Sequence, residues 1–225
     1  MHELFLDIKE SNLNNFKISK VKNMNLMFYH CVSLESLNLS NFDTSQVVTM
    51  NRMFYFCYSL DKLDLSNFDT SKVTDMSYLF SSCKGLTSIN LNDLNTKNVR
   101  NLQYMFSDDS SLLNINLSSF DTSYLLYIDH MFYGCSSLIY LNLSNFYTPK
   151  VNNFAVLFVY CSNYINKRRF SDESVMEKET NTFIFPGKPE CGTVYYNSKF
   201  FNEDMLNVVF KDWEKININY DLNLQ

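Results

Sequence analysis

The cysteines of this chain recur at a fixed interval, and this periodicity constrains the fold more than any other feature of the sequence. Successive cysteines are 26 residues apart, or twice 26, at Cys31, Cys57, Cys83, Cys135 and Cys161. Asp109 stands at the one position that this series skips. A repeat of about 20 to 50 residues indicates units that bury their apolar faces only against their neighbours. The sequence therefore predicts a stack of repeated units.

Within one unit, the apolar spacing predicts a short strand followed by a helical segment. Leu63 and Leu65 flank Asp64, which is the alternation expected of a half-buried strand. Strands of successive units would form a parallel ladder with a spacing of about 4.8 Å.

The second half of the same unit has a different spacing. Val73, Met76 and Leu79 lie three residues apart, which is typical of one face of a short helix or 3₁₀ segment. Thr70 or Ser71 can cap its N-terminus, because a hydroxyl oxygen there accepts from an unpaired backbone N–H.

The segments 31–54 and 57–80 share the pattern Cys-x-Ser-Leu-x-x-Leu-x-Leu-Ser-Asn-Phe-Asp-Thr-Ser-x-Val-x-x-Met. This pattern resembles the BspA-type leucine-rich repeats found in surface proteins of bacteria and some parasitic protists, and the resemblance covers about residues 5–164. It implies an α/β solenoid: a right-handed coil with a parallel β-sheet on one face and short helical or 3₁₀ turns on the other. It also implies attachment or protein binding, and it supplies no catalytic residues.

The register ends after residue 164, so we expect two parts. Residues 1–164 would form a solenoid of about six 26-residue units, and residues 165–225 a loop and an α+β cap. Within the second part, the composition predicts strands at 182–185 and 193–196 and a helix over about 203–210. The first unit begins partway into a coil. Its edge is therefore covered by the first residues, preceded by further chain, or open to pairing with another copy.

Charge and hydropathy exclude several functions. The formal net charge is −5 and no basic stripe is visible, so we expect no nucleic-acid partner. No apolar run reaches the ~18 residues of a spanning helix, so we expect no membrane insertion. The N-terminus lacks the features of a signal peptide. The resemblance favours the cell surface or secretion, and the missing signal leaves a cytoplasmic location open.

Catalytic and metal-binding groupings are weak. The cysteines share a column with apolar neighbours, which favours small buried side chains over disulfides, although neighbouring units would bring Cα atoms within bonding range. His30 next to Cys31 does not provide the paired ligands of a zinc site. Asp108 and Asp109 are interpreted as a solvated bulge rather than a calcium site. We therefore expect no enzymatic activity, no metal and no cofactor.

Two surfaces are candidates for a partner site. On the concave sheet face, polar residues lie between the inward leucines and could bind an extended protein or glycan, or could serve solubility alone: Asn38, Asp64, Asn90, Asn116 and Asn142, with Lys62, Asn114 and Tyr140 beside them. We favour this face over an aromatic cluster on the convex side: Tyr29, Tyr55, Phe56, Tyr58 and Tyr133.

The predicted function is a non-catalytic module for protein binding and adhesion, attaching a cell surface to host or matrix proteins. Two alternatives remain open. One is an intracellular interaction scaffold, and the other is a structural spacer within a longer surface protein.

Overall fold

The structure is a computed structural model. It describes residues 10–13, 16–138, 140–143, 146, 148, 150–151, 157, 182–183, 193–196 and 214–217. The strands are β1 (Glu10–Asn12), β2 (Ser36–Asn38), β3 (Lys62–Leu63), β4 (Asn114–Asn116), β5 (Tyr140–Asn142), β6 (Thr182–Phe183), β7 (Thr193–Tyr196) and β8 (Glu214–Asn217).

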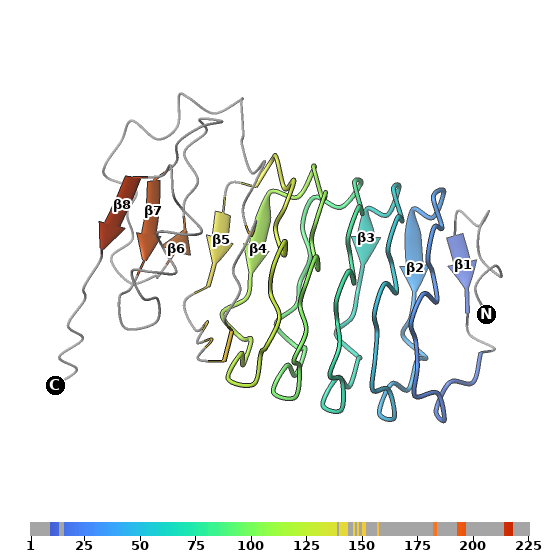
Figure 1. Cartoon of the computed structure of the whole chain (residues 1–225). Helices are drawn as coiled ribbons and strands as arrows, with labels where there is room; N and C mark the ends of the chain where they lie inside the picture. The colour runs from blue at the N-terminus through green and yellow to red at the C-terminus, as the bar shows by residue number, and fades with distance from the viewer. Residues whose placement is uncertain are drawn as a thin grey trace, which may run out of the picture.

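Successive units lie side by side with their strands in parallel (Figure 1). The strand order is β1-β2-β3 in one sheet and β4-β5-β6 in another, and β7 pairs with β8. Ser36 of β2 pairs with Lys62 of β3, and Asn114 of β4 with Tyr140 of β5. The partners are one repeat apart in the sequence, so these units each contribute one strand to the same face, and the unit between β3 and β4 contributes a single bridge at Ser88. We call this the sheet face.

The opposite side of the units carries a second parallel ladder, which we call the back ladder and which consists of the segments 23–31, 49–57, 75–83, 101–109 and 127–135. Single bridges join it at Thr49, Asp75 and Asn101. Arg52 donates its N–H to the Ser77 carbonyl at 2.9 Å. The next residue, Met53, donates locally to the carbonyl three residues earlier, at 3.1 Å. Backbone donors therefore alternate between the neighbouring unit and a local turn.

This ladder corrects the expectation of helical or 3₁₀ turns, because no helix occurs within the described part of the chain. In a helix each N–H would bond within its own segment, whereas here every second one bonds to the next unit. Two residues per unit reach positive φ, as at Arg52 (56°) and Phe56 (65°). The three-residue apolar spacing reflects repeated turns, not helical periodicity.

Thr70, one of the two residues expected to cap a helix, instead bonds to the next unit. The hydroxyl of Thr70 is buried and donates to the carbonyl of Asn95 in the next unit, at 3.0 Å. Thr44 makes the equivalent bond to Asp69, at 3.1 Å. Thr96 bonds in the same way to the carbonyl of Asp121, at 3.2 Å, so the threonines at these three corners connect neighbouring units.

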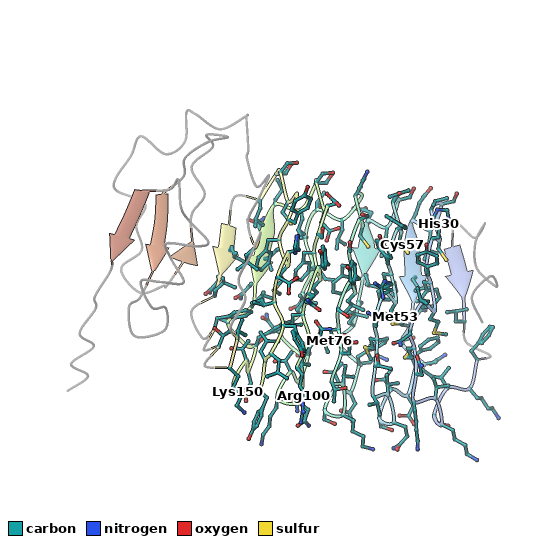
Figure 2. All side chains as sticks on the ribbon, viewed as in Figure 1. His30, Met53, Cys57, Met76, Arg100 and Lys150 are labelled. Carbon is teal, nitrogen blue, oxygen red and sulfur yellow. The ribbon has the colours of Figure 1, made fainter. Side chains whose placement is uncertain are left out.

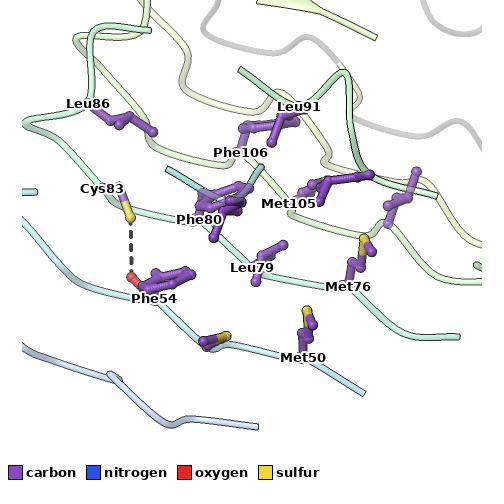
Figure 3. Packing of buried hydrophobic residues seen from close by; sticks show 14 of the residues in the cluster. Met50, Phe54, Met76, Leu79, Phe80, Cys83, Leu86, Leu91, Met105 and Phe106 are labelled. Carbon is purple, nitrogen blue, oxygen red and sulfur yellow. Dashed lines mark hydrogen bonds between the residues drawn. The ribbon is translucent and has the colours of Figure 1, made fainter. Parts of the chain in front are cut away.

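The core consists of columns of identical or similar apolar residues (Figure 3). Phenylalanine rings stack along the units with centroid distances of 5.5 to 5.9 Å, through Phe28, Phe54, Phe80, Phe106 and Phe132. Such offset stacking adds to the free energy gained from burial. Leu65 is 3% exposed in the same core.

The four described thiols of the cysteine column are buried and form no disulfide. Cys83 donates to the carbonyl of Phe54 at 3.2 Å, and Cys57 donates to that of Phe28 at 3.1 Å. Burial raises the pKa of the Cys83 thiol well above its ordinary value, so it stays protonated and can donate. The side chains of Cys161 and Cys191 lie outside the described residues.

We expect reagent titration of the denatured, unreduced protein to find six free thiols, because the packing of the four described cysteines requires no cross-link. Mild reductant should leave the melting temperature unchanged. Mass evidence for a bridge between Cys31 and Cys57 would contradict this and would indicate an oxidising compartment.

In the second part of the chain, β6 and β7 lie within the strands expected at 182–185 and 193–196. β6 pairs antiparallel with β5, through Leu141 and Phe183, so it is the neighbour of the last parallel strand. The helix expected over 203–210 lies outside the described residues.

Candidate functional site

The polar row on the sheet face closes turns. The Oδ1 atoms of Asn38, Asp64, Asn90 and Asn116 each accept the backbone N–H two residues later, at 2.9 to 3.1 Å. This is the Asx turn that short acidic and amide side chains favour. One oxygen of each side chain is therefore committed to ending the strand, and only its second polar atom can face a partner.

The members of the row differ in exposure. Asn38, Asp64 and Asn90 are exposed, Asn116 is half-buried, and Asn142 is buried at 8%. Beside them, Lys62 and Asn114 are exposed, and the Tyr140 side chain lies outside the described residues. The part of the row that a partner can reach is therefore its N-terminal half.

A hollow with a volume of about 620 Å³ lies on this exposed half. Within residues 16–138, no strand pairing joins β3 to the segment 88–90, which pairs only onward at Ser88. The hollow lies at this interruption, and its lining includes Asn38, Asp61, Lys62, Asp64, Ser88 and Asn90.

The turn that contains Gly85 packs tightly against the preceding unit. A Cβ atom on Gly85 would lie 2.9 Å from the carbonyl carbon of Ser59 and 3.0 Å from the oxygen of Leu60. Only glycine permits this approach of the two backbones. The two units are therefore in contact at Gly85, whereas no strand pairing joins β3 to the segment 88–90.

The Asp64 carboxylate in the hollow is held by hydrogen bonds. Hydrogen bonds from the backbone and side chain of Ser66 lower the pKa of Asp64, so this carboxylate is ionised at neutral pH. Asp61 and Lys62 lie three and two residues before it in the sequence and are exposed. The site offers two carboxylates, one ammonium group, amides and hydroxyls to a polar ligand.

The aromatic cluster predicted on the other side is partly continuous. The Tyr29 and Tyr55 rings are 5.6 Å apart, and Phe56 lies 3.8 Å from Tyr55 and 5.6 Å from Tyr58. Tyr58 is 38% exposed. Tyr133 instead contacts the His130 ring, at 5.8 Å. Apart from Tyr58, which directly follows it, these residues belong to the end of the back ladder, not to helical turns.

The sequence reasoning missed a second aromatic column beside this cluster. The Arg52 guanidinium lies 4.2 Å from the Tyr78 ring centre, Tyr78 stacks on Tyr104 at 4.4 Å, and Tyr104 stacks on His130 at 4.3 Å. Burial raises the pKa of Tyr104. These residues recur once per repeat, so aligning the units could have found them. Their stacked faces contact one another, which leaves mainly ring edges for a partner.

Asp109 corrects the interpretation of a solvated bulge. It is 0% exposed and replaces cysteine in the buried column. Its Oδ1 atom accepts the N–H of Cys83 at 2.7 Å, and its Oδ2 atom has no partner. Burial raises the pKa of Asp109 well above its ordinary value. The protonated, neutral form of the Asp109 carboxyl is therefore favoured inside the core.

Other chemical groupings are few in the part of the chain that the structure describes. There, no three His, Cys, Asp or Glu side chains are placed to hold a metal ion. His130 contacts Asp129, with 3.2 Å between Nδ1 and Oδ2. No helix among these residues has the length and apolar character needed to cross a membrane.

The class defined by this geometry is a repeat protein of stacked 26-residue units with polar and aromatic surfaces. The chain belongs to the family described as "Mycoplasma protein of unknown function, DUF285", whose model matches residues 1–112 and 87–188. No curated protein and no solved structure is significantly similar to it.

Proposed function

We propose that the chain is a right-handed leucine-rich-repeat solenoid that acts as a non-catalytic binding and adhesion module at a cell surface. Membership of a repeat family supports the module, and the BspA-type pattern supports both the solenoid and the surface location. The partner is an extended segment of a host or matrix protein, held on the sheet face.

The hollow at β2, β3 and the segment 88–90 is the observation that carries this proposal. Its polar groups are held by a buried core and by Asx turns, so a partner would find them already ordered. Rigid groups lose little conformational entropy on binding. Lys62 and Asp64 present opposite charges side by side, which suits the alternating polar groups of an extended peptide.

The alternative of an intracellular scaffold is supported by the described cysteines, which are buried and form no disulfide, because reduced cysteines are typical of the cytosol. It shares the sheet-face site and differs only in partner and location. A structural spacer would need no such hollow.

The test uses fibronectin, collagen and laminin as immobilised probes. We expect at least one to bind, and the double substitution Lys62→Gln with Asp64→Asn to weaken that binding by about 1 to 2 kcal/mol. The pair leaves the net charge unchanged, and asparagine keeps the Oδ1 acceptor for Ser66. The melting temperature should therefore stay the same.

Tyr55→Ser with Tyr58→Ser is the control on the aromatic cluster. Loss of binding in this control, with full binding by the sheet-face variant, would move the site to the aromatic cluster. Absence of binding to every probe would favour the spacer.

A further inference from the structure

A row of basic side chains runs along the lower edge of the units, where the chain turns from the sheet face to the back ladder (Figure 2). Its members occupy two neighbouring columns of the repeat, and all are exposed: Lys20, Lys22, Lys72, Arg100 and Lys150. We call this row the basic stripe. Stacking of the units brings these side chains together, and the expectation of no nucleic-acid partner stays a prediction.

The backbone joins neighbouring units along the stripe. Val48 donates to the carbonyl of Lys22, Thr74 to that of Val48, and Arg100 to that of Thr74, at 2.8 to 2.9 Å. Consecutive positions are therefore about 4.8 Å apart, as in a β ladder. The remaining described positions of these two columns are occupied by neutral residues: Gln46, Val48, Thr74, Asn98, Tyr124 and Leu126. None of these positions carries a carboxylate.

Among the described residues, no carboxylate forms a salt bridge with a basic group of the stripe. Hydrogen bonds from Ser45 and Ser71 lower the pKa of Asp43 and Asp69, and the nearby Lys72 ammonium adds to both shifts. Among the described residues, the one ion pair joins Asp129 and His130. Within the stripe, Lys72 donates to the neutral amide of Gln46 at 3.1 Å, and the Lys150 ammonium lies 4.0 Å from the centre of the Tyr124 ring. Without a salt bridge the basic groups can still pair with a ligand, although Asp43 and Asp69 reduce the positive potential around Lys72.

Carboxylates precede and follow the stripe along the chain, but they are held close to the backbone. Asp43, Asp69 and Asp121 each accept the N–H of the serine two residues later, at 2.9 to 3.1 Å. Asp75, which follows the stripe, accepts from Ser77 in the same way, at 2.9 Å. Long basic side chains extend further than these carboxylates, so an anion meets the basic groups first.

This arrangement leaves a positive row about two side chains wide between acidic residues. A bilayer or a duplex would press its phosphates against the neighbouring aspartates, whereas a single linear chain would not. Single-stranded nucleic acid needs aromatic faces for its bases, and the Tyr124 face is occupied by Lys150. Sugar hydroxyls, by contrast, can bond to Gln46, Thr74 and Asn98.

We propose that the basic stripe binds a linear acidic polysaccharide, sulfated or carboxylated, lying along the stacking direction. The polymer carries regularly repeated anions, which contact basic groups over about 24 Å between Lys20 and Lys150. This surface is separate from the hollow on the sheet face and does not depend on the proposed protein partner.

The experiment measures binding of the full chain to heparin oligosaccharides, used as the probe. We expect binding at low salt that weakens as salt rises, because bound anions and counterions exchange. The double substitution Lys72→Gln with Arg100→Gln should weaken binding about tenfold, the equivalent of 1.4 kcal/mol.

The matched control is Lys62→Gln with Lys84→Gln, which removes the same charge from exposed positions outside the stripe. It should bind heparin within about twofold of the unchanged chain. All variants should melt alike, since surface substitutions have small effects on stability. The sheet-face pair Lys62→Gln with Asp64→Asn should also leave heparin binding intact, which separates this proposal from the proposed function.

Three results would overturn the proposal. The first is no binding to heparin at low salt, and the second is an equal loss of binding in the two doubly substituted variants. The third is tighter binding to a single-stranded oligonucleotide, to duplex DNA or to phosphatidylglycerol vesicles than to heparin.

Discussion

Replacing Leu65 with aspartate is expected to abolish cooperative unfolding. Leu65 is 3% exposed and belongs to the continuous core. A charge placed there without a partner costs several kcal/mol, about as much as the whole stability of many domains. Each unit is stabilised by its neighbours, so the loss spreads to them. Thermal unfolding followed by circular dichroism would lose its sharp transition.

The control for this prediction is the adjacent Asp64→Asn. Its side chain is exposed, and asparagine keeps the acceptor for the Ser66 N–H. Its unfolding free energy should change by about 0.5 kcal/mol or less. Similar melting curves for the two variants would show that the strand is registered differently from the structure.

Replacing Asp109 with cysteine is expected to stabilise the protein at neutral pH. The buried Oδ2 atom of Asp109 has no partner, and such a group costs about 1 to 3 kcal/mol. A cysteine would restore the column in which the Cys83 and Cys135 thiols donate to backbone carbonyls. Urea unfolding should show an increase of about this size in the unfolding free energy.

The pH dependence provides a second measurement for the same substitution. Burial holds the pKa of Asp109 higher in the folded chain than in the unfolded one. The folded chain therefore binds more protons, and its stability falls as pH rises from the unfolded value through the folded pKa. The slope from one such group is at most about 1.4 kcal/mol per pH unit. Asp109→Cys should remove this slope.

An exposed acid serves as the control. Asp93→Asn removes one carboxylate from an exposed position and should change neither the stability at neutral pH nor the slope. Lower stability of Asp109→Cys at neutral pH, or an unchanged slope, would mean that the carboxylate is well satisfied in the core.

The sequence alone determined the period, the register and the buried columns. Residues one repeat apart, such as Phe54 and Phe80, have the same chemistry because they occupy the same environment in successive units, and they stack at 5.8 Å as the period requires. Leu65 follows from the same alignment. Repetition reveals this much because each unit packs on a copy of itself. The handedness and the leucine-rich-repeat class stay predictions.

Only the tertiary structure decided which hydrogen bonds the repeated residues make. A three-residue apolar spacing suits both a helix and a series of turns, and bonds such as Arg52 to Ser77 select the ladder. The Oδ1 atom of Asn90 closes a turn, which leaves its Nδ2 group for a partner. Lys72 and Arg100 joined one stripe, and Asp109 became a buried acid, because their surroundings come from the neighbouring units. A position along the chain shows its neighbours in sequence, and the burial and charge around a side chain depend on neighbours in space.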